Sequence, residues 1–149
     1  WAQERGLPIL AYITFAEVAA IEYVKNQQNL LLAPLFAASR MLEKANLNLQ
    51  DFDYYEIHEA FAAQVLATLK IWESPELSAE IGLKKTLGAI DREKLNVKGS
   101  SLAAAHPFAA TGGRIIGVMA KLLNEKGSGR GFISICAAGG QGVTMIIEK

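Results

Sequence analysis

Residues 131–148 read Gly131-Phe-Ile-Ser-Ile-Cys136-Ala-Ala-Gly139-Gly140-Gln-Gly142-Val-Thr-Met-Ile-Ile-Glu148. Apolar and β-branched residues dominate both ends of this stretch, which is typical of strands. The glycines between the two ends permit positive φ angles and a sharp reversal of the chain. The stretch therefore predicts a two-stranded hairpin with a glycine-rich loop. Cys136 is the only cysteine of the chain, and we expect its sulfur to face backbone N–H groups and a cleft where the first strand enters that loop.

The composition indicates one globular domain and excludes several kinds of partner. The 149 residues are 51% hydrophobic, which is enough to bury a substantial core. Fifteen basic residues balance fifteen acidic ones, so no excess of positive charge attracts nucleic acid or anionic lipid. Charged residues or proline interrupt the longest apolar stretches, and we expect no membrane span. A single cysteine cannot form an internal disulfide, which favours a reducing compartment.

The first residues favour a fragment of a longer polypeptide. Trp1 to Arg5 resemble the last turn of a helix, which Gly6 and Pro8 would end. No cationic and then apolar leader opens the chain. We therefore expect residues 1–149 to be a single domain from the C-terminal part of a larger protein.

Upstream of the hairpin, strand-like and helix-like segments alternate. Strands are expected over residues 8–20, which is apolar on both faces and should be covered on both sides, over 51–57, and more weakly over 95–105. Helices are expected over residues 34–45, 60–72 and 111–126, after a polar crossover at 25–29. The order is βαβαβαββ. It predicts an α/β fold with a mixed five-stranded sheet flanked by helices.

Three details of these helices follow from residue spacing. The inner face of the second helix is expected to carry four apolar residues, namely Phe61, Val65, Leu66 and Leu69. Thr111 is a candidate cap for the third helix, which Gly127 would end. The charged segment 74–94 is expected to be a solvated insertion with a short surface helix.

The two histidines and the cysteine are the candidates for chemistry. His58, His106 and Cys136 each stand where a strand-like segment meets a loop or helix, and such junctions converge at one edge of a sheet. Taken singly, each histidine also fits a structural role, and the cysteine fits a small buried apolar residue. Their separations lack metal-ligand spacing, so we expect no metal. Phosphate-loop and nucleophile-elbow motifs do not occur in the sequence.

Three motifs resemble the C-terminal domain of a thiolase. They are His58-Glu-Ala-Phe-Ala62, Leu95-Asn-Val97 followed by His106-Pro-Phe-Ala-Ala-Thr-Gly112, and Cys136-Ala-Ala-Gly-Gly-Gln-Gly142. Their order and the final hairpin extend the resemblance over nearly the whole chain. Many thiolases have asparagine in place of His58. The His-Glu-Ala-Phe form, with the insertion at 74–94, is similar to the subgroup in β-oxidation multienzyme complexes, of which it forms the β subunit.

The resemblance implies thiolytic cleavage of a 3-ketoacyl-CoA by CoA, through a covalent acyl-enzyme. His106 would accept the proton of a nucleophilic cysteine and then help to hold a substrate oxygen. Cys136 would give a proton to the departing acetyl-CoA enolate and take one from incoming CoA, a task that suits a thiol because neighbouring donors can lower its pKa. His58 would share with His106 an oxyanion hole for the enolate oxygen.

The resemblance also assigns three less reactive positions. The backbone N–H of Ala138 would help to form a second oxyanion hole, for the tetrahedral intermediates. Ala60 and Phe61 would line the pantetheine tunnel, although a core position is an equal expectation for Phe61. Alanine stands at 105, 109 and 138 where relatives commonly have glycine, and Ala105 would alter the His106 loop if that position needs a positive φ.

Two alternatives remain open at this point. A ketoacyl-synthase half would also supply histidines, although such synthases lack the loop cysteine. A non-catalytic module for dimerisation or partner binding is the other alternative, because the nucleophilic cysteine belongs to the N-terminal half of a thiolase and is absent here. For the whole protein we expect CoA as a substrate, no cofactor, a homo-oligomer, a partner hydratase/dehydrogenase subunit, and a location in the bacterial cytoplasm or the mitochondrial matrix.

Overall fold

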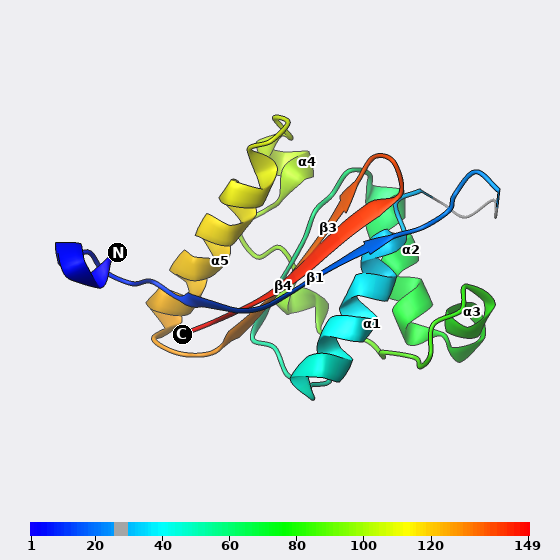
Figure 1. Ribbon diagram of the computed structural model, residues 1–149, viewed down its shortest axis with the longest axis horizontal. Helices are drawn as coiled ribbons and strands as arrows, with labels where there is room; N and C mark the ends of the chain where they lie inside the picture. The colour runs from blue at the N-terminus through cyan, green and yellow to red at the C-terminus, as the bar shows by residue number, and fades with distance from the viewer. Residues whose placement is uncertain (26–29) are drawn as a thin grey trace.

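A mixed β-sheet forms the centre of the computed structural model, which describes residues 1–25 and 30–149 (Figure 1). The strands are β1 (Tyr12–Ala20), β2 (Tyr54–Ile57), β3 (Arg130–Ala137) and β4 (Gln141–Glu148). They lie in the order β1-β4-β3-β2. The predicted hairpin is the antiparallel pair β3 and β4, β1 runs antiparallel to β4, and β2 runs parallel to β3. The α/β class and the mixed sheet are thus confirmed.

The sheet has four strands within the described residues, so the prediction of five is wrong. The segment expected to be the fifth, 95–105, contributes one isolated bridge between Leu95 and Tyr55. Asn96 and Gly99 have φ angles of 49° and 77°, which turn the chain out of the extended conformation. The segment ends in the short helix α4 (Ser101–Ala104) instead.

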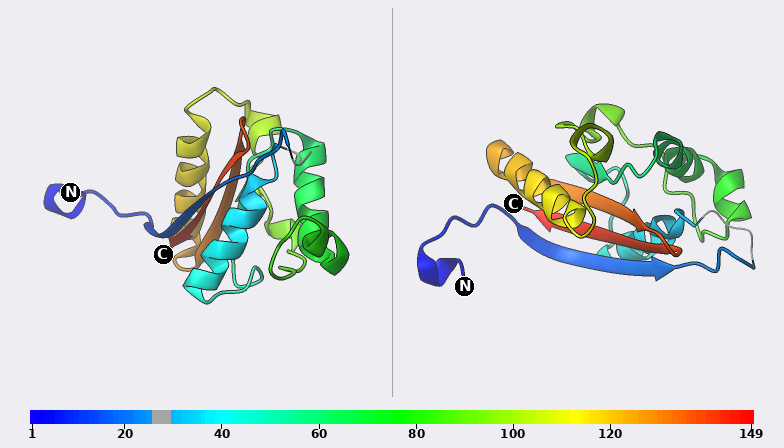
Figure 2. Two further views of the ribbon diagram at one scale, coloured as in Figure 1. Left: turned by 45° about the vertical axis from the view of Figure 1, so that its right-hand side comes forward. Right: turned by 90° about the horizontal axis from the view of Figure 1, so that it is seen from above.

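Helices cover both faces of the sheet, as Figure 2 shows. On one face α1 (Ala33–Ala45) and α2 (Ala62–Glu73) pack against Phe132 and Ile146, and on the other α5 (Thr111–Lys126) packs against Ile133 and Ile147. Neighbouring strand residues therefore point to opposite cores, as the pleat of a strand requires. The polar crossover predicted at 25–29 lies outside the described residues from 26 onward.

The inner face of α2 differs from the prediction. Val65 and Leu69 are buried, whereas Phe61 and Leu66 are 63% and 53% exposed. Phe61 precedes the first helical turn with an extended backbone, so it does not share the helix face. A core position for Phe61 is therefore wrong.

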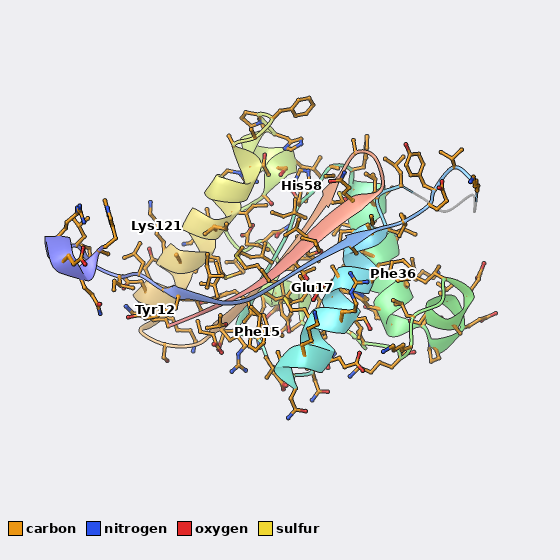
Figure 3. All side chains as sticks on the ribbon, viewed as in Figure 1. Tyr12, Phe15, Glu17, Phe36, His58 and Lys121 are labelled. Atoms are coloured by element: carbon orange, nitrogen blue, oxygen red, sulfur yellow. The ribbon has the colours of Figure 1, made fainter. Side chains whose placement is uncertain are left out.

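The first strand is not covered on both sides. β1 forms an edge of the sheet, and of its residues only Ala19 is buried. Tyr12, Ile13 and Val18 are each more than half exposed. Figure 3 shows Tyr12 and Phe15 on this outer strand. β1 is therefore apolar on both faces, as the sequence indicated, but in this chain one apolar face of the strand is left uncovered.

The insertion at 74–94 is only partly solvated. Its short helix α3 (Pro75–Glu80) is present, and the Ser74 hydroxyl accepts a hydrogen bond from the N–H of Leu77 at 3.2 Å. A 3₁₀ turn, η2 (Arg92–Lys94), ends the segment. A second 3₁₀ turn, η1 (Gln3–Arg5), lies near the N-terminus and ends at Gly6. Leu83, Leu87 and Ile90 are buried in the core beside α1 and α2, so this segment contributes to packing.

Candidate active site

A cavity of about 670 Å³ opens at the end of the sheet, and residues of the β3–β4 loop, the start of α2 and the loop after α4 line it. All six side chains or positions proposed from the sequence line it: His58, Ala60, Phe61, His106, Cys136 and Ala138. The remaining lining residues are mostly apolar or small: Leu30, Leu31, Phe108, Ala109, Thr111, Gly112, Ile135 and Ala137. Three titratable side chains thus share one largely apolar hollow, which is typical of ligand sites.

His58 follows the last residue of β2 and is held there by the backbone. Its N–H donates to the carbonyl of Ser134 on β3 at 2.8 Å, which extends the parallel ladder by one residue. The Asn96 side chain accepts from the N–H of Ile57 at 2.9 Å and donates to its carbonyl at 3.0 Å. Asn96 thereby replaces the missing fifth strand at this point. His58 is 1% exposed, and in the view of Figure 3 it is labelled between α5 and the β3–β4 hairpin.

The buried side of the His58 ring is polar. Its Nδ1 lies 2.7 Å from the hydroxyl oxygen of Ser101, to which the Arg114 guanidinium donates at 3.0 Å. Desolvation, together with the charges of His106 and Arg114, lowers the pKa of His58 to about 4, although the charge of Glu59 acts in the opposite direction. His58 is therefore a neutral ring at physiological pH.

His106 lies in the loop between α4 and α5 and is exposed. Its ring centroid is 4.3 Å from that of His58, with the planes tilted by 48°. Its Nδ1 lies 2.5 Å from the Thr111 hydroxyl oxygen. Thr111 was predicted to cap α5, but its hydroxyl contacts His106 and the Pro107 carbonyl, and Ala110 occupies the cap position without a side-chain hydrogen bond. The Thr111 hydroxyl therefore orients the His106 ring and does not cap α5.

Two alanines flank His106 with left-handed backbone. Ala105 has φ 69° and ψ 174°, a region that residues other than glycine rarely adopt, and Ala109 has φ 65°. Position 105 therefore adopts a positive φ, which explains why glycine is common there in relatives. The loop carries strain of about 1 to 3 kcal/mol at such a residue.

Cys136 is the penultimate residue of β3 and lines the cavity, as expected, although only 6% of its surface is exposed. Burial raises the pKa of its thiol to about 11. A backbone hydrogen bond acts to lower this pKa, as neighbouring donors can, but desolvation outweighs it. The side chain is thus a protonated thiol at neutral pH.

The glycines after Cys136 are required by their surroundings. Gly139 and Gly140 have φ angles of 89° and 74°, which make the reversal. A Cβ on Gly142 would lie 2.3 Å from the backbone nitrogen of Pro34, at the start of α1. The loop therefore packs closely against α1, and Ala138 within it has no positive φ.

Sequence reasoning did not assign a role to Ser101, Arg114 or Glu56. Glu56 is wholly buried on β2, and neither carboxylate oxygen accepts a hydrogen bond from the described residues. Burial raises its pKa to about 7, although the nearby Arg114 and Ser100 lower it. The sequence could have identified Glu56 as a buried carboxylate, because it stands inside the otherwise apolar strand Tyr-Tyr-Glu-Ile. No local pattern marks Ser101, because its contacts are long-range.

Two further observations concern the described residues only. No helix in residues 1–25 and 30–149 is long and apolar enough to cross a membrane. Over the same residues, histidine, cysteine and carboxylate side chains form no group of three that could hold a metal ion.

The chain is similar to known thiolases over nearly all of its length. The family model described as "Thiolase, C-terminal domain" matches residues 7–149. The chain is 45% identical to a 3-ketoacyl-CoA thiolase of Colwellia psychrerythraea and 44% identical to one of Alteromonas mediterranea, covering 99% of this chain and 33% of each relative. A crystal structure of the Bacillus anthracis acetyl-CoA acetyltransferase matches with a TM-score of 0.76 at 37% identity, over 99% of this chain and 32% of that one. The chain thus spans about a third of the length of these relatives. It belongs to the thiolase family, and it corresponds to the C-terminal domain.

Proposed function

We propose that this chain supplies one wall of the active site of a 3-ketoacyl-CoA thiolase, an acetyl-CoA C-acyltransferase. The observation that carries the proposal is the shared cavity, to which the end of β2, the loop after α4 and the end of β3 bring His58, His106 and Cys136. The names of the relatives support the choice of reaction. The nucleophilic cysteine of the whole enzyme would come from the remaining two thirds of such a protein.

In the first half-reaction the nucleophilic cysteine attacks the 3-keto carbon, after His106 takes its proton. The bond between C2 and C3 then breaks, which leaves the acyl group on the cysteine and releases acetyl-CoA as its enolate. His58 and His106 would donate hydrogen bonds to the thioester oxygen on which the negative charge develops. Their ring centroids, 4.3 Å apart, suit a common acceptor between them.

Cys136 would protonate the enolate carbon and become a thiolate. In the second half-reaction this thiolate takes the proton of CoA, and the CoA sulfur attacks the acyl-enzyme carbonyl. The nucleophilic cysteine leaves as a thiolate and takes its proton back from His106. A pKa raised by burial supports the first of these steps, because the resting side chain keeps its proton. The N–H of Ala138 would stabilise the tetrahedral oxyanion of acyl transfer.

The cavity also supports the proposed substrate and partners. Ala60 and the exposed Phe61 ring offer an apolar wall for the pantetheine arm of CoA, which is a substrate, and no resident cofactor is proposed. The uncovered apolar residues of β1 support a missing N-terminal domain that packs on them. A homo-oligomer, a hydratase/dehydrogenase partner and a cytoplasmic location in a bacterium complete the proposal, in keeping with the bacterial relatives.

Replacing Cys136 in the full-length protein tests this function. We expect Cys136→Ser to lower CoA-dependent loss of 3-ketoacyl-CoA by about 10³-fold or more, because a serine hydroxyl is a far weaker acid than a thiol. Acyl-enzyme should still form to a detectable extent, since the nucleophile is untouched, and mass spectrometry of the intact protein would show it. Ala79→Ser, at an exposed position of α3 outside the cavity lining, is the matched control. Full turnover by Cys136→Ser would remove Cys136 from the mechanism.

A further inference from the structure

A row of polar groups runs behind His58, on the side away from the cavity. It begins at Arg114 on α5, passes through the hydroxyl of Ser101 at the start of α4, and ends at Nδ1 of the His58 ring. Ser101 is 5% exposed and His58 is 1% exposed, so water does not compete for these contacts. The direction of each hydrogen bond can therefore be assigned from the donors and acceptors present.

Arg114 fixes the first direction. A guanidinium is always protonated and has no acceptor, so it donates to the Ser101 oxygen at 3.0 Å. The Ser101 hydroxyl has one hydrogen left to donate. Among the described residues the only acceptor in contact with that oxygen is Nδ1 of His58, at 2.7 Å. The serine therefore donates, and Nδ1 accepts through its lone pair.

The opposite arrangement is energetically unfavourable. If Nδ1 carried a proton and donated to Ser101, the serine hydrogen would remain buried without an acceptor. An unsatisfied buried donor costs free energy, which corresponds to about a fivefold to 150-fold preference for the first arrangement. A doubly protonated ring is disfavoured as well, because burial removes the charge from water and the charges of His106 and Arg114 oppose it, against Glu59 alone in its favour.

We propose that Ser101 and Arg114 are positioning residues that hold His58 as the neutral tautomer with its proton on Nε2. This inference deepens the proposed function and rests on it for its catalytic meaning. A neutral imidazole has one donor, and placing that donor on Nε2 makes the ring an N–H group for the developing enolate oxygen. The other tautomer would present a lone pair to that oxygen and repel it.

The two histidines differ in this respect. The Thr111 hydroxyl that contacts Nδ1 of His106 also reaches the Pro107 carbonyl, at 3.5 Å, so it has two acceptors to choose between. The ring of His106 is not restricted to one tautomer by its neighbours. A group that takes and returns a proton needs that freedom, whereas a group that only donates does not.

Nitrogen NMR of the full-length protein with ¹⁵N-labelled histidine tests the proposal, because long-range ¹H–¹⁵N spectra distinguish Nδ1–H from Nε2–H rings. His58→Asn assigns the signal. We expect the wild-type ring to be protonated on Nε2 alone at pH 7, and Ser101→Ala to convert it to a mixture of tautomers. Ser101→Thr keeps a hydroxyl and should restore the wild-type spectrum. Thr111→Val should leave the His58 signal unchanged.

Activity provides the second measurement. We expect Ser101→Ala to lower kcat by about tenfold to a hundredfold with KM little changed, because the lost alignment matters in the transition state. A proton on Nδ1 in the wild type, or an unchanged tautomer in Ser101→Ala, would overturn the proposal, and the wild-type spectrum decides even if that variant fails to fold. An Nε2–H ring in a protein without thiolase activity would instead refute the proposed function alone.

Discussion

The end of β2 and the loop after α4 bring the two histidines to one cavity by different means. His58 is an extension of a parallel strand pair, buried, with the Asn96 side chain bound to the preceding residue. His106 stands in an exposed loop between two alanines with positive φ, and its ring is oriented by Thr111 from the same loop and helix. One position is determined by a ladder of hydrogen bonds, and the other by a strained local conformation.

The difference shows where tolerance to substitution should lie. Long-range hydrogen-bond partners fix the position of a residue at a strand end. Loss of one partner therefore both moves the side chain and destabilises the sheet. A strained loop stores free energy that a suitable substitution can release. Removing support from His58 should therefore cost stability, whereas relaxing the His106 loop should increase it.

The largest effect is expected from Asn96, which supports the His58 side. Its side chain makes two hydrogen bonds to Ile57 and one to the Glu59 carboxylate, at 2.8 Å. Asn96→Ala should lower the free energy of unfolding by about 4 kcal/mol, since it leaves buried backbone groups unpaired and places alanine at a positive φ. Denaturant unfolding of the protein measures this.

A glycine at the same position separates the two causes. Asn96→Gly removes the side chain but tolerates the φ of 49°, so about 3 kcal/mol should be lost. If both variants unfold like the wild type, Asn96 does not support the strand end.

The second effect is a pair of opposed pH dependences at buried groups. His58 has a pKa of about 4 in the folded protein against an ordinary value of 6.5, so its contribution to stability is complete above pH 6.5 and is lost as pH falls toward 4. Glu56 has a pKa of about 7 against 4.5, so its contribution is complete below pH 4.5 and is lost as pH rises toward 7. Each amounts to up to about 3 kcal/mol.

Single variants should separate these contributions, which partly cancel between pH 4.5 and 6.5. In His58→Asn the Tm should decrease as pH rises through this range, because only Glu56 titrates. In Glu56→Gln the Tm should decrease as pH falls, because only His58 does. Thermal unfolding of both variants and the wild type across this range gives the measurement. Parallel curves for all three proteins would contradict the assigned pKa shifts.

The smallest effect is expected in the His106 loop and has the opposite sign. Ala105→Gly should raise the free energy of unfolding by about 1 kcal/mol, because relief of the left-handed strain exceeds the added freedom of glycine in the unfolded chain. Ala103→Gly, two residues earlier in α4, should lower it by about 0.5 to 1 kcal/mol. A lower Tm for Ala105→Gly than for the wild type would show that the loop is not strained.

Local chemistry in the sequence was sufficient for several elements. The apolar, β-branched runs and the glycines of 131–148 predicted the hairpin, and the 3.6-residue periodicity after Pro34 and Thr111 predicted α1 and α5. The motifs around His58, His106 and Cys136 located the cavity, whose geometry supports the roles proposed for them. The hairpin, the two helices and each motif depend on residues near one another along the chain.

The tertiary structure alone decided the features that depend on distant residues. The sheet has four strands within the described residues because Asn96 and Gly99 turn the chain away, and Leu83, Leu87 and Ile90 became core because they meet α1 and α2. The contact of Ser101 with His58 and the raised pKa of Cys136 likewise have no local pattern. Hydrogen-bond direction and desolvation depend on which groups surround an atom in space, and spacing along the chain carries no record of that.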